Sequence, residues 1–74
     1  MNKDRRKRLG SAFDMVAKAK EILEDVKAEE SESYDNLPEQ FRDGERGEEM
    51  QGYIEMLEEA YNYLDDANSV IEQI

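Results

Sequence analysis

The chain has 74 residues, with no cysteine and no histidine, and its 20 acidic against 10 basic residues give a net charge of −10. These numbers exclude a disulfide framework and a thiolate metal site, and they remove the commonest general base and metal ligand. A chain of this length forms one small domain that needs a partner or another staple to become stable. High charge also occurs in disordered chains, but the regular spacing of the apolar residues favours helices here.

The charge is distributed unevenly along the chain. Residues 1–10 hold five basic side chains and one acidic one, whereas residues 11–74 hold five basic and nineteen acidic ones. An acidic body repels nucleic acid and anionic bilayers and attracts basic proteins. No apolar run is long enough to cross a membrane, and no apolar signal-peptide core follows the basic start. We therefore expect a cytoplasmic protein that contacts no membrane and does not bind nucleic acid directly.

A first helix is expected over residues 2–35. Its apolar residues recur at helical spacing along one broad face: Leu9, Phe13, Val16, Leu23 and Val26, with Ala12, Met15, Ala19 and Ile22 beside them. Gly10 is the weak point, because glycine inside a helix costs about 1 kcal/mol relative to alanine. A helix that starts only at Ser11 is the alternative.

Residues 36–43 are expected to form a corner. Pro38 disfavours helical geometry at Leu37 and suits the first position of a short helical turn that runs through Phe41. Asp43 is a good N-cap for the next helix. Leu37 and Phe41 are large and apolar, so we expect both to fold back and close the open end between the helices.

A second helix is expected over residues 44–74. One row of its apolar residues is spaced by sevens, namely Met50, Leu57, Leu64 and Ile71. A second row follows three places later, namely Tyr53, Ala60, Ala67 and Ile74. These two rows predict the heptad seam against a neighbouring helix. Further rows flank them on either side, Ile54 with Tyr61 on one and Met56 with Tyr63 and Val70 on the other.

Two long helices joined by a short corner predict an all-α antiparallel hairpin. A helix with one neighbour needs an apolar stripe of about two residues in seven, and the second helix has four such rows. We therefore expect a homodimer that forms a four-helix bundle, or else a different target protein. The interface residues are expected to be Phe13, Val16, Leu23, Met50, Tyr53, Ile54, Met56, Leu57, Tyr61, Tyr63, Leu64 and Ile71.

The basic amino end has two interpretations. In a hairpin, Arg5, Arg6 and Arg8 approach the acidic residues at the end of the second helix, namely Asp65, Asp66 and Glu72, and the last carboxylate. Exposed ion pairs of this kind contribute about 0–1 kcal/mol each. In an oligomer, several such tips can instead converge into a pocket for a small anionic ligand such as a nucleotide.

Enzyme and metal chemistry find little support in the sequence. Acid/base catalysis by carboxylates needs a buried acid and a cleft, and the acids here fall on water-facing helix positions. A calcium loop starting at Asp35 fails, because Gln40 stands in the place of its glycine and Leu37 in the place of its third ligand. The segment 44–47, GERG, matches a backbone-clamping GxxG only weakly among its acidic neighbours, and it is interpreted as a permissive helix start. We expect no enzyme, no cofactor and no metal.

The corner and its flanks resemble a group of small acidic proteins encoded by bacteriophages, prophages and mobile elements of bacteria. Members of this group pair a basic start with a corner of the LPE…ERGE type and a heptad-like acidic helix. The resemblance covers residues 1–9 and 33–74, and its most specific positions are Leu37, Pro38, Glu39, Glu45, Arg46, Gly47 and Glu48. Relatives commonly carry leucine and serine where this chain has Phe41 and Asp43–Gly44.

The resemblance implies a bacterial host cytoplasm and a non-enzymatic role, but no catalytic residues. Small acidic phage proteins often bind host proteins, and some block host defence by imitating the negative surface of DNA. Three functions therefore stay open at this point. They are inhibition of a host protein with a basic surface, sequestration of an anionic ligand at Arg5, Arg6 and Arg8, and a structural or regulatory helical bundle.

Overall fold

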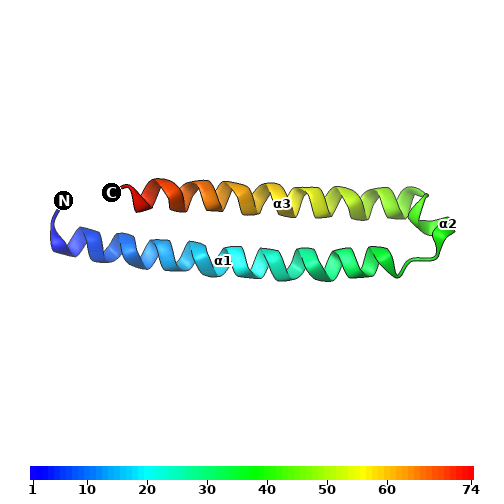
Figure 1. The fold of residues 1–74 in the computed structure, drawn as a ribbon, viewed down its shortest axis with the longest axis horizontal. Helices are drawn as coiled ribbons and strands as arrows, with labels where there is room; N and C mark the ends of the chain where they lie inside the picture. The colour runs from blue at the N-terminus through cyan, green and yellow to red at the C-terminus, as the bar shows by residue number, and fades with distance from the viewer.

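The computed structural model describes all 74 residues and contains only helices (Figure 1). Helix α1 spans Lys3–Asp35, the single turn α2 spans Glu39–Arg42, and α3 spans Glu45–Glu72. Helices α1 and α3 run antiparallel and side by side, and α2 forms the corner at the end opposite both termini. The molecule is a rod of 59 × 15 × 12 Å. The all-helical architecture with a pair of long helices is confirmed.

Helix α1 begins at the amino end and is continuous through Gly10. The side chain of Asn2 caps it, because the Asn2 Oδ1 atom accepts a hydrogen bond of 2.8 Å from the main-chain N–H of Arg5. A cap of this kind satisfies one of the four free N–H groups of the first turn. The alternative start at Ser11 is therefore wrong.

The corner differs from its prediction at two residues. Asp43 ends α2, with its main-chain N–H bonded to the carbonyl of Glu39, so the N-cap of α3 is Gly44 and no side chain caps this helix. Phe41 is half exposed and does not close the open end between the helices, whereas Leu37 is half-buried. At this corner the main chain of α2 packs closely against α3, through Arg42 and Gly47.

Gly47 is the residue that lets the main chain pack closely at the corner. It lies in the first turns of α3, and it is one of only two buried residues of the protein. A Cβ atom placed on Gly47 would overlap the main-chain carbonyl group of Arg42. Glycine at this position therefore permits close contact between the end of α2 and α3, which goes beyond the permissive helix start inferred from the sequence.

The line of contact between α1 and α3, called the seam here, follows a 3–4 spacing on both helices. On α1 it consists of Leu9, Phe13, Val16, Lys20, Leu23, Lys27, Glu30 and Tyr34. On α3 it consists of Gly47, Met50, Ile54, Leu57, Tyr61, Leu64, Asn68 and Ile71. The row that begins at Met50 thus packs together with the row of Ile54 and Tyr61. The predicted seam, which joined the first row to that of Tyr53, is wrong, because Tyr53 is exposed.

The hairpin has no closed hydrophobic core. No apolar side chain is fully buried, and the two buried residues are Gly47 and Asn68. Seam residues such as Leu23 and Leu57 are only half-buried, because a single neighbouring helix covers them from one side. Small domains without a sufficient core depend on a partner or another staple for stability.

Candidate protein-binding faces

A second apolar stripe lies beside the seam on each helix. On α1 it consists of Ala12, Met15, Ala19, Ile22 and Val26. On α3 and the residues after it, the stripe consists of Tyr53, Met56, Ala60, Tyr63, Ala67, Val70 and Ile74. Each of these residues except Ile74 directly precedes a seam residue in the sequence. The two stripes together are called the apolar face below.

Both stripes lie on the same side of the hairpin. One residue corresponds to a rotation of about 100° around a helix axis, so each stripe is turned from its seam by this angle in the same sense. Because α1 and α3 are antiparallel, equal rotations about the two axes bring both stripes to one side.

The apolar face is exposed to an unusual degree. Ten large apolar side chains of the protein are exposed, and all but Met1 and Phe41 belong to this face. Met15, Tyr63 and Met56 are 73%, 65% and 63% exposed. The face contains no charged residue along its length. Exposed apolar surface of this kind is typical of interaction sites, which makes this face a candidate for protein binding.

Two tyrosines of the apolar face are fixed at their hydroxyl ends. The Tyr53 hydroxyl donates a hydrogen bond of 2.7 Å to Glu49, and the Tyr63 hydroxyl donates one of 3.0 Å to Glu59. These hydrogen bonds are the main reason that the pKa of each phenol is raised above its ordinary value. A tyrosine held at its polar tip presents its ring as a rigid apolar surface, which suits a protein interface.

The opposite side of the hairpin is acidic. The residues that directly follow a seam residue are turned by about 100° in the other sense, and none of them is basic. Nine of these positions are carboxylates, namely Asp14, Glu21, Glu24, Asp35, Glu48, Glu55, Glu58, Asp65 and Glu72. This side is called the acidic face below. The molecule is therefore amphipathic as a whole, with apolar and acidic faces on opposite sides of the seam.

Seam lysines neutralise a small part of the acidic face. Lys20 forms an ion pair with Asp65 across the helices, and its ammonium group lies 5.1 Å from the centre of the Tyr61 ring. The hydrogen bond to Asp65 is the main cause of the raised pKa of Lys20. Lys27 forms a longer pair of 3.6 Å with Glu58. The other carboxylates of the acidic face lack a cross-helix ion pair.

Asn68 is the one buried polar side chain, and the sequence patterns did not single it out. It is 5% exposed, and its Nδ2 atom donates a hydrogen bond of 3.1 Å to the main-chain oxygen of Phe13. Its Oδ1 atom has no partner. A single asparagine in a helical seam fixes the register of the two helices at some cost in stability. The available signal was its position seven residues after Tyr61.

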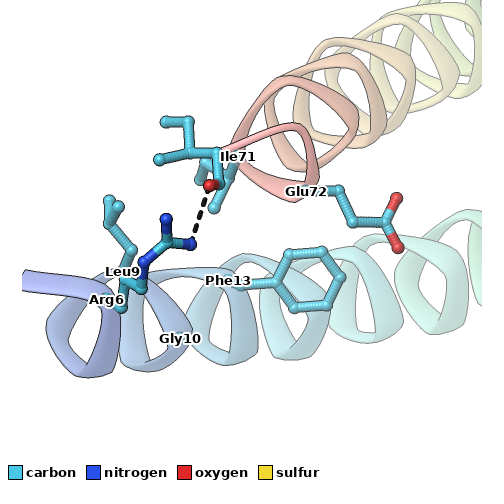
Figure 2. A pocket seen from close by; sticks show the side chains of 7 residues that line it. Arg6, Leu9, Gly10, Phe13, Ile71 and Glu72 are labelled. Carbon is cyan, nitrogen blue, oxygen red and sulfur yellow. Dashed lines mark hydrogen bonds between the residues drawn. The ribbon is translucent and has the colours of Figure 1, made fainter. Parts of the chain in front are cut away.

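The basic tip makes one contact with the other end of the chain. Figure 2 shows Arg6 reaching from α1 toward the end of α3, where its Nη1 atom donates a hydrogen bond of 2.9 Å to the main-chain oxygen of Ile74. Arg8 instead pairs with Asp4 of its own helix at 3.1 Å. The predicted approach of Arg8 to acids of α3 is wrong, because Asp4 lies one turn away and Lys20 already pairs with Asp65.

The two depressions at this end have different linings. Beside Arg6, an open groove of about 340 Å³ is lined mainly by Leu9, Phe13 and Ile71 (Figure 2). Arg5 and Arg8 line a second depression together with Met1 and Leu9. Of the three predicted anion contacts, Arg6 and Arg8 therefore each have a partner within the chain, Ile74 and Asp4 respectively, and Arg5 lies beside Arg8 at the surface.

The twelve residues predicted as an interface are divided by the structure. Three lie on the apolar face, namely Tyr53, Met56 and Tyr63, and the other nine lie in the seam. The apolar residues of α1 that the sequence placed beside its main row, such as Met15 and Ile22, belong to the apolar face as well. The sequence pattern therefore identified residues of both the seam and the apolar face, but it did not distinguish the two surfaces.

Comparisons with known proteins assign no family to the chain. No family model, no curated protein and no solved structure matches it. The structure contains no cluster of three histidine, cysteine or acidic side chains with the geometry of a metal site. Neither long helix combines the length and apolar character needed to span a bilayer.

Proposed function

We propose that the protein is a non-enzymatic inhibitor that pairs with a second copy into a four-helix bundle and binds a basic surface of a host protein. The observation that supports this proposal is the separation of the apolar face from the acidic face. The apolar face suits burial against another helical hairpin, and the acidic face then remains on the outside. The resemblance to phage and mobile-element proteins supports a host protein as the target.

The acidic face has properties expected of a competitor of nucleic acid. Its nine carboxylates follow two parallel rows along a straight rod of 59 Å. Duplex DNA also presents rows of negative charge, at the higher density of one charge per about 1.7 Å of axis. A bundle of two hairpins carries such a face on each side. A host protein of the nucleic-acid-binding type, such as a defence factor, offers a complementary basic groove.

Retention of host proteins from bacterial lysate tests this function. Immobilised protein is expected to retain basic nucleic-acid-binding proteins at about 50 mM salt and to release them at about 500 mM, because salt screens exposed charges. Added duplex DNA should release the same proteins, since both ligands occupy one groove. Retention that neither salt nor DNA reverses would contradict the proposal.

Two variants of equal charge locate the binding surface. The first removes four negative charges from the acidic face, through Glu21→Gln, Glu24→Gln, Glu55→Gln and Glu58→Gln. The control removes four negative charges elsewhere on the helices, through Asp25→Asn, Glu32→Gln, Glu45→Gln and Asp66→Asn. We expect the first variant to lose retention and the control to keep most of it. Equal losses in both would show that net charge alone, and not the acidic face, causes retention.

A further inference from the structure

We propose that the two copies in the bundle run in opposite directions, so that the basic tip of each copy lies against the acidic corner of the other. This inference rests on the pairing proposed above and gives its geometry. It follows from the position of the apolar face along the rod, from the order of residues within it, and from the charges at the two ends.

The apolar face is centred on the rod. The cross-helix contacts place Lys20 level with Asp65 and Lys27 level with Glu58. In this register the stripe of α1, residues 12–26, lies level with residues 59–73, so the two stripes share this stretch and the stripe of α3 continues to Tyr53 toward the corner. The tip and the corner extend beyond it on either side. A second copy can therefore cover the whole face in either direction, and other properties must select one.

The size of the face fits a stable dimer. The rod is 59 Å long and 15 Å wide, so the whole side that carries the apolar face, with its charged ends included, has an area of about 900 Å². A standard protein interface buries roughly 800 Å² on each partner. Because a single hairpin has no buried apolar core, burial of this face supplies what the fold lacks.

The order of residues along the stripe of α1 favours opposite directions. In helical spacing the stripe reads Ala12, Met15, Ala19, Ile22 and Val26, and the next positions beyond its two ends are Arg8 and Glu29. When α1 of a second copy runs in the opposite direction and is centred on the same residue, Ala19, Ala12 of one copy lies opposite Val26 of the other. Met15 then lies opposite Ile22. This arrangement also places the cation Arg8 of each copy opposite the anion Glu29 of the other. Each small residue thus meets a small or medium one, and each charge meets its opposite.

The stripe of α3 has the same property about its own centre. Turned end for end about Tyr63, it places Tyr53 opposite Ile74, Met56 opposite Val70, and Ala60 opposite Ala67. In the register set by the ion pair between Lys20 and Asp65, Ala19 lies level with Asp66, which is three residues, or about 4.5 Å along the rod, from Tyr63. The two centres thus lie within one helical turn of each other, so a single two-fold axis near the middle of the rod serves both helices.

The net charges of the two ends point the same way. The tip end, residues 1–10 and 70–74, carries five basic and two acidic side chains. The corner end, residues 29–53, carries two basic and nine acidic side chains. Copies in opposite directions bring unlike ends together twice, whereas copies in the same direction bring like ends together. Like charges placed across an interface disfavour that arrangement.

The distance between two spin labels tests the direction. The chain has no cysteine, so Gln40→Cys at the exposed corner gives one labelling site per copy. Opposite directions place the two labels at far ends of the 59 Å rod, at about 50 Å or more, whereas the same direction places them within about 20 Å. Asn62→Cys, near the middle, is the control and should give a distance below about 35 Å in both cases.

A charge exchange tests the contact between Arg8 and Glu29. Arg8→Glu and Glu29→Arg are each expected to weaken the dimer about tenfold, because the two-fold axis repeats each lost contact twice. The double variant is expected to recover most of the affinity. Double-variant affinity no better than the product of the two single losses would overturn this contact.

The outcomes separate this inference from the proposed function. A short distance at Gln40→Cys overturns the opposite directions, and the absence of a distance at both sites overturns pairing itself. Both measurements use the purified protein alone. Failure to retain a basic host protein would therefore contradict the function without affecting the labels.

Discussion

The seam and the apolar face lie one residue apart along both helices, yet they differ in composition. The seam, which holds the hairpin together, includes Lys20, Lys27, Glu30 and the buried Asn68. The apolar face, which nothing covers in the hairpin, contains no charged or amide side chain. Over the length of the apolar face, the seam beside it is thus the more polar of the two, and charged residues of the preceding row stand only beyond the ends of the face, at Arg8, Glu29, Arg46 and Glu49. This difference supports the proposal that the apolar face is buried between molecules.

The first prediction breaks the apolar face at its centre. Tyr63→Glu places a charge close to the proposed two-fold axis, where two copies of it are buried and repel each other. We expect dimerisation to become less favourable by about 3 kcal/mol or more. The helix content at low protein concentration should decrease as a result. Analytical ultracentrifugation and circular dichroism measure both.

The neighbouring residue provides the control for this prediction. Asn62→Glu adds the same charge one position away, where the side chain is exposed and follows the seam residue Tyr61 on the opposite side from the apolar face. We expect dimerisation to change by less than about 0.5 kcal/mol. Equal effects of Tyr63→Glu and Asn62→Glu would mean that added charge alone, and not the apolar face, governs association.

The second prediction concerns the corner. Gly47→Ala forces a Cβ atom onto the main chain of Arg42, so α2 or the first turn of α3 must move. We expect a loss of about 1–3 kcal/mol in the free energy of unfolding, as for other overpacked sites. Gly52→Ala, with open space around its Cβ position, should instead add about 0.5–1 kcal/mol.

Urea or thermal unfolding followed by circular dichroism distinguishes the two glycines. A stabilised Gly47→Ala variant would show that the close approach of α2 and α3 does not exist. Because both positions lie within α3, the general effect of alanine on helix stability is the same in the two variants. The difference between them therefore measures the contact at the corner.

The third and smallest effect concerns pH. Hydrogen bonds to Glu49 and Glu59 raise the pKa of Tyr53 and Tyr63 above the ordinary value of 10, and the Asp65 bond raises that of Lys20. A raised pKa contributes stability that is fully present below the unfolded value and is lost as the pH rises through the folded value. We therefore expect stability to decline above about pH 10.

A variant that lacks the two phenols sharpens this prediction. Tyr53→Phe with Tyr63→Phe keeps the rings of the apolar face and removes both ionising groups, so its decline above about pH 10 should be shallower. Urea unfolding midpoints between about pH 7 and pH 11 compare the two proteins. Parallel curves would show that these hydroxyl groups do not contribute to the pH dependence.

The hydrophobic periodicity was sufficient to predict two helices and a corner near Pro38. It was insufficient to decide which rows pack inside the hairpin, because rows that differ by one residue have the same period of seven. The true seam contains the polar residues Lys20 and Asn68, so a search for apolar rows alone did not identify it. A lysine stem fills a seam with methylene groups while its ammonium reaches an acid outside, so the seam need not be apolar throughout.

The corner was predicted in outline but not in its contacts. Proline restricts the residue before it in any context, so the end of α1 followed from the sequence. The role of Gly47 depends on how closely α2 approaches α3, which is a distance between segments and not a local preference. The exposure of Phe41 also depends on how α2 is placed against α3, where Phe41 lines an open depression with Gly44 and Glu45.

The molecular mass in solution tests the central claim most directly. Sedimentation equilibrium of the unmodified protein is predicted to give a mass of about 17 kDa, twice the 8.7 kDa of one chain, with helix content that falls as dilution dissociates it. A fully helical species of 8.7 kDa at every concentration would contradict the account, because the apolar face would then be stable in water without a second copy.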